Sequence, residues 1–205
     1  LDKQKKVALL GGDHSTPYGF IKALSERYRD FAVLQIDAHA DLRQAYEGFI
    51  HSHASIMYNV ITDLPNVSLV QFGIRDYCDE ELAFMQAHPQ RIRTFFDRDI
   101  KRGLYEGKTW KTVCEELIAA LPQRVYISFD IDGLDPKLCP NTGTPVPGGF
   151  ELEQIFYLLS TLKASRRELI GFDLNEVSSG DNEQETIDPI VGARLLYKLC
   201  GLLVS

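Results

Sequence analysis

The fold of this chain is indicated most clearly by one stretch, Val125-Tyr126-Ile127-Ser128-Phe129-Asp130-Ile131-Asp132-Gly133-Leu134-Asp135-Pro136. An apolar run without regular polar alternation is typical of a parallel strand that is covered on both faces. The run passes directly into acidic residues, and open α/β sheets bind their ligands beyond the carboxyl ends of the strands. The stretch therefore predicts a buried strand, Val125–Phe129, followed by a candidate site that begins at Asp130.

Other short apolar runs have the same character and predict further strands: Val7–Leu10, Ala32–Ile36, Val67–Phe72 and Leu169–Leu174. Arg91–Phe96 is a candidate for one more strand. Apolar residues recur at helical spacing in the segments between them: Tyr18–Tyr28, Val113–Leu121, Leu152–Leu159 and Val191–Leu199. Strands that alternate with helices predict a three-layer α/β/α sandwich around a mostly parallel sheet. We expect it to be one domain that spans residues 1–205.

The composition is that of a folded protein with ordinary apolar content, and the net charge is −7. An acidic chain lacks the basic patches that nucleic-acid binding requires. No apolar run approaches the roughly eighteen residues of a membrane span, and the amino terminus does not read as a signal peptide. The four cysteines form no C-x-x-C pair, which favours reduced thiols. We therefore expect a cytoplasmic protein without a membrane or nucleic-acid partner.

Acidic residues and histidines follow four of the predicted strands: His14, Asp37, His39, Asp41, Asp130, Asp132 and Glu176. Residues at alternate positions of an extended chain share one side, which groups Asp37 with His39 and Asp41. Asp130 and Asp132 have the same spacing. Because the carboxyl ends of parallel strands meet at one edge of a sheet, we expect these side chains to gather there.

Four carboxylates at one sheet edge would repel one another and would be costly to bury. Two divalent cations offset this charge, and carboxylates can bridge two ions about 3.5–4 Å apart. Ligands rich in oxygen and without thiolates favour Mn²⁺ or Mg²⁺ over structural zinc. The set therefore predicts a centre that holds two divalent cations.

Each motif alone has an ordinary structural interpretation. An Asp-x-Asp pair after a strand is often a solvated loop or a helix cap. The segment Gly11-Gly12-Asp13-His14 could be a turn in which Asp13 caps a helix that begins near Pro17. The metal interpretation is favoured because the motifs coincide at aligned strand ends.

Four motifs in this order resemble those of the ureohydrolase family: Gly11-Gly12-Asp13-His14-Ser15, Asp37-Ala38-His39-Ala40-Asp41, Ser128-Phe129-Asp130-Ile131-Asp132-Gly133-Leu134-Asp135-Pro136 and Gly143-Thr144-Pro145-Val146-Pro147-Gly148-Gly149. That family includes arginase, agmatinase and formimidoylglutamase, and the resemblance covers essentially the whole chain. The stretch from Tyr46 to Ser55 looks most like the agmatinase branch. The resemblance implies an arginase-like fold and a hydrolase of guanidino compounds.

The resemblance also implies a ligand set for two Mn²⁺ ions per chain. His14 and Asp41 would bind one ion, and His39 and Asp132 would bind the other. The remaining two ligands, Asp37 and Asp130, would bridge both ions.

Three catalytic roles follow from the same resemblance. Glu176 would hold the substrate guanidinium, and His53 would shuttle protons. Asp41 would accept a proton from the hydroxide between the metals, which attacks the guanidinium carbon. With agmatine as substrate, the products would be urea and putrescine, so the expected role is in polyamine biosynthesis.

The chain departs from the family pattern at two places. Arginases carry a Ser-Gly-Asn-type segment before the catalytic histidine, whereas this chain has Phe49-Ile50-His51-Ser52. The difference favours agmatine over arginine. Family members also carry a substantial segment before the Gly-Gly-Asp-His motif, where this chain has ten residues. We therefore expect either that the protein continues upstream of Leu1 or that this chain lacks upstream strands of the fold and is inactive.

Other functions stay open at this point. One is a hydrolase of guanidinobutyrate, arginine or formimidoylglutamate, in which Arg43 would meet a substrate carboxylate. Another is a non-catalytic relative that acts as an interaction protein. A deacetylase with a single metal is a third. His51 is expected in a supporting or surface role, and the resemblance implies a homo-oligomer, either a trimer or a hexamer.

Overall fold

The computed structural model describes residues 5–180 and 186–204. Its centre is one sheet of six strands in the order β1-β6-β5-β2-β3-β4. The strands are β1 (Ala8–Leu10), β2 (Phe31–Ile36), β3 (Val67–Ile74), β4 (Ile92–Phe96), β5 (Arg124–Asp130) and β6 (Glu168–Asn175). Every neighbouring pair is parallel. The sheet is therefore parallel throughout, and the candidate strand at Arg91–Phe96 is present as β4.

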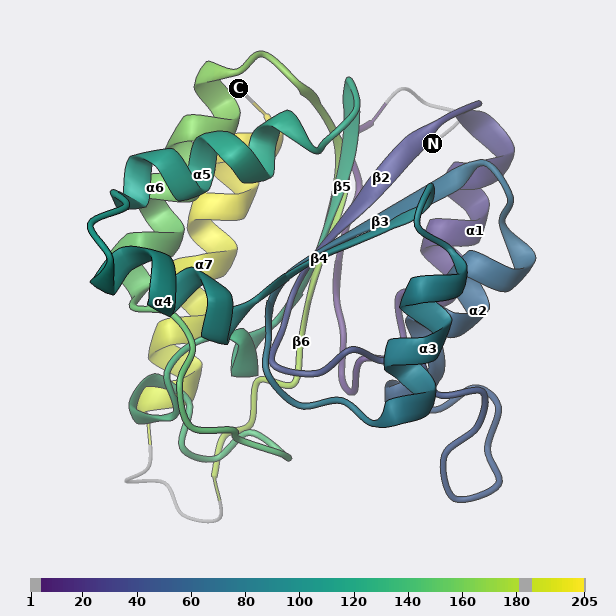
Figure 1. Cartoon of the computed structure of the whole chain (residues 1–205), viewed down its shortest axis with the longest axis horizontal. Coiled ribbons are helices and arrows are strands. Elements are labelled where there is room, and N and C mark those ends of the chain that lie inside the picture. Colours follow the sequence, from purple (N-terminus) through teal and green to yellow (C-terminus); the bar gives the residue numbers. More distant parts are fainter. Residues whose placement is uncertain (1–4, 181–185, 205) are drawn as a thin grey trace.

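Helices cover both faces of the sheet (Figure 1). One face carries α1 (Tyr18–Arg27), α2 (Ile56–Asp63) and α3 (Asp79–Ala87). The other carries α4 (Asp97–Tyr105), α5 (Trp110–Ala119), α6 (Leu152–Ala164) and α7 (Ile187–Leu203). Side chains that alternate along β2 enter two separate apolar clusters, since Val33 packs in one and Leu34 in the other. The three-layer sandwich is confirmed.

Three of these helices, α2, α3 and α4, were not expected from the apolar spacing. Each has only eight or nine residues. In α4 the buried residues are Asp97 and Ile100, and Leu104 packs against the core one turn after Ile100, so its apolar stripe is too short to predict a helix from spacing alone. The helix α5 has a clearer start, because the side chain of Thr109 accepts a hydrogen bond from the amide of Thr112.

The strand register places the acidic residues in one row. Ile36 pairs with Phe129 in the neighbouring strand, so Asp37 and Asp130 leave the sheet side by side. On the other side of β5, Asp130 pairs with Asn175. Because parallel strands share one direction, this register alone assembles the row at the carboxyl edge.

Three short 3₁₀ turns complete this edge: η1 (His53–Ser55), η2 (Ile131–Gly133) and η3 (Pro136–Leu138). The turn η2 passes so close to the end of β2 that a Cβ on Gly133 would lie 2.9 Å from the amide nitrogen of Asp37. A glycine is required there, and it brings the two acidic motifs into contact.

Two further findings concern the cysteines and the helices. All four cysteines are free thiols. Within residues 5–180 and 186–204, no helix combines the length and the apolar character that crossing a bilayer demands.

Candidate metal centre

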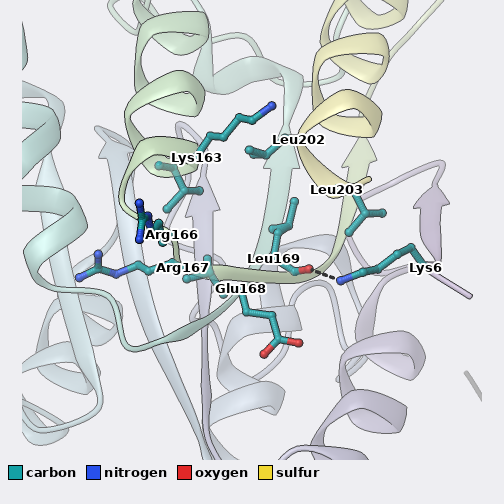
Figure 2. A pocket seen from close by; sticks show the side chains of 10 residues that line it. Lys6, Lys163, Arg166, Arg167, Glu168, Leu169, Leu202 and Leu203 are labelled. Atoms are coloured by element: carbon teal, nitrogen blue, oxygen red, sulfur yellow. Dashed lines mark hydrogen bonds between the residues drawn. The ribbon is translucent and has the colours of Figure 1, made fainter. Parts of the chain in front are cut away.

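Two hollows of about 380 Å³ lie at opposite edges of the sheet. The hollow at the amino ends of β5 and β6 is lined by basic side chains that extend in different directions (Figure 2). Lys6 donates to the backbone oxygen of Leu169 at 3.2 Å, and Arg167 to that of Leu121 at 3.2 Å. Two of its cations are therefore already engaged with backbone carbonyls, and the basic groups do not converge on one point.

The hollow at the carboxyl edge is lined by acidic residues and histidines that the sequence predicts there. Its lining includes His39, Asp41 and His53, together with aromatic and loop residues on the rim: Arg43, Tyr46, Tyr77, Thr144, Pro145 and Val146. Asp37, Asp130 and Asp132 are buried behind this lining. This hollow is the candidate functional site.

Three carboxylates surround one imidazole nitrogen at the floor of the site. The Nδ1 atom of His14 lies 2.9 Å from Asp37 Oδ2, 3.0 Å from Asp41 Oδ2 and 3.4 Å from Asp130 Oδ2. We call His14, Asp37 and Asp41 the first half-site, because one ligand atom of each lies within 4.8 Å of the others. Asp130 borders this half-site directly.

A second group of three shares one of these carboxylates. His39 Nδ1 lies 2.9 Å from Asp132 Oδ2 and 3.7 Å from Asp37 Oδ1. We call Asp37, His39 and Asp132 the second half-site. Asp37 thus turns one oxygen to each half-site, as a bridging ligand must. Asp130 reaches the second half-site only through its Oδ1 atom, which accepts the amide of Asp132 at 2.9 Å.

The first half-site has the geometry of a cation site more than that of a hydrogen-bonded cluster. His14 Nδ1 and Asp41 Oδ2 are buried and 3.0 Å apart, yet neither atom has a hydrogen-bond partner. Buried polar atoms without partners are costly, and an ion between them would satisfy both. The donor set of carboxylates and imidazoles suits a hard divalent cation. The residues present therefore fit a metal centre.

The pKa values show the same crowding of charge. Burial and the charge of Asp37 raise the pKa of Asp41 to about 8. Burial and the neighbouring acids also raise the pKa of Asp130 well above its ordinary value. Burial alone would lower the pKa of His39, but hydrogen bonds to Asp132 and Asp37 raise it to about 11. Without cations, the site must therefore retain protons on groups that cations would otherwise neutralise.

Polar side chains inside the strands support the ligands from behind. His14 Nε2 lies 2.8 Å from the hydroxyl of Ser128, which donates to Asp173 Oδ1 at 3.0 Å. Gln35 donates to Asp37 Oδ2 at 2.9 Å and accepts from Gln71 at 2.8 Å. Such contacts fix ligand orientation and tautomer. Ser128, Asp173 and the two glutamines were not singled out from the sequence, although a polar residue within a buried apolar strand is a signal for such a role.

Two of the four non-glycine residues with positive φ in the described chain are residues expected in catalysis. Asp41 and Glu176 have φ values of 55° and 61°, in the left-handed region that residues with a side chain rarely adopt. Glu176 is held there from both sides, since its amide donates to Gly12 O at 2.8 Å and its Oε1 accepts the amide of His14 at 2.9 Å. Strain of this kind tends to collect at functional sites.

The remaining residues considered from the sequence lie at different distances from the half-sites. His53 lies at the start of η1 on the wall of the hollow, with its ring centroid 5.4 Å from that of Tyr46. Burial raises the pKa of Glu176 overall, and the charge of His53 acts in the opposite direction, so the two groups interact. His51 is exposed beside Tyr18 and belongs to neither half-site. Arg43 Nε lies 3.9 Å from Glu81 on the rim.

A divalent cation at the half-sites should stabilise the protein, and more strongly at higher pH. The folded-state pKa values of Asp41 (about 8) and His39 (about 11) lie above the unfolded ones, so their contribution to stability is lost as pH rises through the folded values. Metal binding removes those protons and strengthens with pH. A cation at a hundred times its Kd adds about 2.7 kcal/mol, or about 5–10 °C in Tm for a chain of this size.

Thermal unfolding with Mn²⁺ and with chelator, at pH 6 and pH 8, measures this effect. We expect the chelated protein to be less stable at pH 8 than at pH 6, and the gain on adding Mn²⁺ to be larger at pH 8. An equal gain at both pH values would contradict the charge balance described above.

Comparison with known proteins gives one consistent result. The model of the Arginase family matches residues 1–201. The N(1)-aminopropylagmatine ureohydrolase of a Thermus thermophilus strain is 38% identical over 199 residues, which are 97% of this chain and 62% of that protein. The agmatinase of Halalkalibacterium halodurans is 31% identical over 97% of this chain and 64% of its own length. The chain thus spans a little over three fifths of these relatives.

Solved structures agree with the sequence relatives. A putative agmatinase from Clostridium difficile superposes with a TM-score of 0.82 at 26% identity, covering 98% of this chain and 68% of that one. The arginase of Medicago truncatula superposes with a TM-score of 0.79 at 27% identity, covering 95% and 58%. With the family match over nearly the whole chain and this agreement in fold, the chain belongs to the arginase family.

Proposed function

We propose that the protein is a ureohydrolase that binds two Mn²⁺ ions and hydrolyses the guanidino group of agmatine or of a closely related amine. The observation that carries the proposal is the pair of half-sites joined by Asp37 at the floor of an open hollow. The agmatinases and aminopropylagmatine ureohydrolases among its relatives support the substrate class. The products are urea and an amine, which is putrescine when agmatine is the substrate.

In this proposal the metals are held by His14, Asp37 and Asp41 in the first half-site, with Asp130 beside them, and by Asp37, His39 and Asp132 in the second. When bound, two divalent cations supply Lewis-acid activation of water near neutral pH. Ser128 and Gln35, which are buried within the strands, hold the side chains of His14 and Asp37 in place. A water-derived oxygen is added to the guanidinium carbon, a C–N bond of that carbon breaks, and the amine leaves with a proton.

The protein's own residues orient the substrate and move the protons. Glu176 uses one carboxylate oxygen for the amide of His14, and its negative charge can pair with the planar guanidinium. Asp41 faces the same hollow and can accept the proton released by the attacking water. His53, on the wall of the hollow, can deliver a proton to the departing amine. The side chain of Glu176 is held by the amide of His14, which limits the reorganisation that catalysis requires.

The rim of the hollow favours a cationic tail over a carboxylate. Arg43 is the basic group that could meet a substrate carboxylate, but its guanidinium lies 5.6 Å from the ring centre of Tyr46 and its Nε 3.9 Å from Glu81. Its charge is therefore already partly balanced. Asp76 lines the same hollow, where its Oδ2 lies 3.7 Å from His39 Nε2 and 62% of its side chain is exposed, so it can also attract a protonated amine. This arrangement supports agmatine over guanidinobutyrate or formimidoylglutamate.

A second candidate substrate is agmatine that carries an aminopropyl group. The Thermus thermophilus relative, at 38% identity, is named for this compound. Loss of urea from it would leave a triamine instead of putrescine. The outer lining of the hollow is made of loop and helix residues away from the metal ligands, and the longer tail would contact these residues.

The deciding experiment is urea release from the Mn²⁺-loaded protein, with a metal count on the same sample. Agmatine, N(1)-aminopropylagmatine, arginine and guanidinobutyrate should be compared. We expect two metals per chain and turnover of one of the first two compounds. Turnover of arginine or guanidinobutyrate instead would change the substrate, and one metal per chain would favour a deacetylase. Two metals without urea from any compound would favour a non-catalytic relative.

Replacing Glu176 with Gln should lower kcat/KM by about 100–1000-fold, because an unpaired guanidinium in the site costs several kcal/mol. The metal count should not change, since Glu176 belongs to neither half-site. A matched control is Glu47→Gln, because Glu47 is an exposed glutamate with φ 50° on the turn that follows Tyr46. Steady-state kinetics on both variants test the assignment, and equal losses in the two would contradict it.

A further inference from the structure

Arg75 follows β3 and joins the end of this strand to two loops, at residues 132–134 and at residue 146, that lie far along the chain. Its Nη2 donates to Asp132 O at 2.7 Å, to Leu134 O at 3.1 Å and to Val146 O at 2.8 Å. Its Nε also donates to Val146 O at 3.2 Å, and its Nη1 to Gly73 O at 3.3 Å. One side chain thus connects the end of a central strand with two loops at the carboxyl edge.

These two loops have different tasks in the site. Asp132 supplies a carboxylate to the second half-site, whereas Val146 lies on the wall of the hollow together with Thr144 and Pro145. The same nitrogen of Arg75 serves both loops. A shift of either loop must therefore move or break a contact that the other loop also uses.

We propose that Arg75 is a positioning residue that keeps the wall of the hollow in register with the second half-site. The affinity of the second half-site for its cation and the affinity of the hollow for substrate then both depend on the Arg75 guanidinium, which contacts neither the cation nor the substrate. The expected effect on substrate affinity rests on the proposed function, whereas the expected effect on metal affinity can be measured with Mn²⁺ alone.

The loop behind Val146 is packed onto Arg75 and has a second anchor. A Cβ on Gly148 would lie 3.2 Å from Cδ of Arg75 and 2.9 Å from Oδ2 of Asp97. Lys101 Nζ donates to Gly149 O at 2.7 Å. Two cations from different elements therefore hold the loop at its two ends, but only Arg75 also reaches the metal-ligand loop.

The geometry requires an arginine. A guanidinium offers five N–H donors in a rigid plane, so it can serve carbonyls on several sides at once. A lysine ammonium at the end of a flexible chain cannot reach carbonyls on both loops with the same fixed separation. Arg75→Lys should therefore keep the charge and lose the register.

The chain offers a matched control in Arg91. Its Nε donates to Val67 O at 3.1 Å, its Nη1 to Ile61 O at 2.7 Å and its Nη2 to Leu64 O at 2.6 Å. This second carbonyl clamp lies at the amino end of β3, whereas Arg75 follows the carboxyl end. Arg91→Lys removes the same kind of contact without touching the site.

The experiment compares the parent protein, Arg75→Lys and Arg91→Lys. Thermal unfolding reports the structural loss, Mn²⁺ titration of the chelator-treated protein reports the two cation affinities, and urea release reports KM and kcat. We expect both variants to lose similar stability. Only Arg75→Lys should lower the affinity of the second half-site for Mn²⁺, by about tenfold. The same variant should raise KM about tenfold with a smaller change in kcat.

Lys101→Met removes the other cationic contact of the wall loop. Gly149 loses its hydrogen bond to Lys101, whereas Arg75 still bonds to Asp132 O and Phe150 N still bonds to Gly133 O at 3.2 Å, so KM should rise while both Mn²⁺ affinities stay unchanged. If Arg75→Lys changes only stability, as Arg91→Lys does, the inference is overturned. If the parent protein releases no urea from any guanidino compound, the proposed function fails, and the Mn²⁺ titration still decides whether Arg75 positions the second half-site.

Discussion

Asp37→Asn should abolish urea release, lowering kcat by at least about 10³-fold, and should reduce bound Mn²⁺ from two ions per chain to one or none. Asp37 contributes one oxygen to each half-site. Its surroundings leave no harmless orientation for an amide, because Gln35 donates to Oδ2 and the amide of His39 donates to Oδ1. The NH₂ group of asparagine would face a donor in either orientation, and it would repel a cation there.

A metal count and steady-state kinetics on purified Asp37→Asn test this expectation. Asp135→Asn is a suitable control, because Asp135 also follows β5 closely but its carboxylate caps the turn η3 through the amide of Lys137 and lies 3.5 Å from the Lys137 ammonium, away from both half-sites. That variant should keep both metals and nearly full turnover. Two tightly bound ions in Asp37→Asn would show that Asp37 does not bridge the half-sites.

Gly149→Ala should cost about 2–4 kcal/mol of folding stability, on the order of 10 °C in Tm. A Cβ at this position would lie 2.5 Å from the carbonyl oxygen of Leu134 and 2.8 Å from that of Gly133. Both are backbone atoms and cannot rotate away. The residue also has φ 83°, which penalises any side chain. Relief of the clash must displace the turn η2, which carries Asp132.

Gly107→Ala separates the cost of the positive φ from the cost of the steric clash. Gly107 has φ 98°, but nothing lies within 4 Å of the position that a Cβ would take. Gly107→Ala should therefore lose about 1 kcal/mol of folding stability, from the unfavourable backbone conformation alone. The difference between the stability losses of the two variants, measured by thermal unfolding, gives the free-energy cost of the steric clash. Mn²⁺ affinity should fall in Gly149→Ala alone. Equal Tm values for the two would mean that the loop yields without cost.

The strand ends could be predicted from the sequence because their physics is local. A buried apolar run that passes into acids marks the carboxyl end of a parallel strand, and this logic places Asp37, Asp130 and Asp132 together. The register then brings Asp37 beside Asp130. The roles of Asp41, His53 and Glu176 stay proposals, since a geometry without substrate does not test them.

Other features depend on contacts that no local pattern encodes. The helices α2, α3 and α4 are short, and packing against the sheet stabilises them more than their own periodicity does. Ser128 and Asp173 look like interruptions of an apolar strand until the fold places them behind His14. Arg75 has no sequence signal of its own, because its partners are backbone oxygens of distant segments.

The strands that carry the second half-site are held firmly by the sheet. His39 and Asp132 follow β2 and β5, each of which pairs with a neighbouring strand on both sides. Opening a segment that is paired on both sides requires close to the free energy of global unfolding, and amide hydrogen exchange measures this free energy. The amides of β2 and β5 should therefore be among the last in the protein to exchange with deuterium.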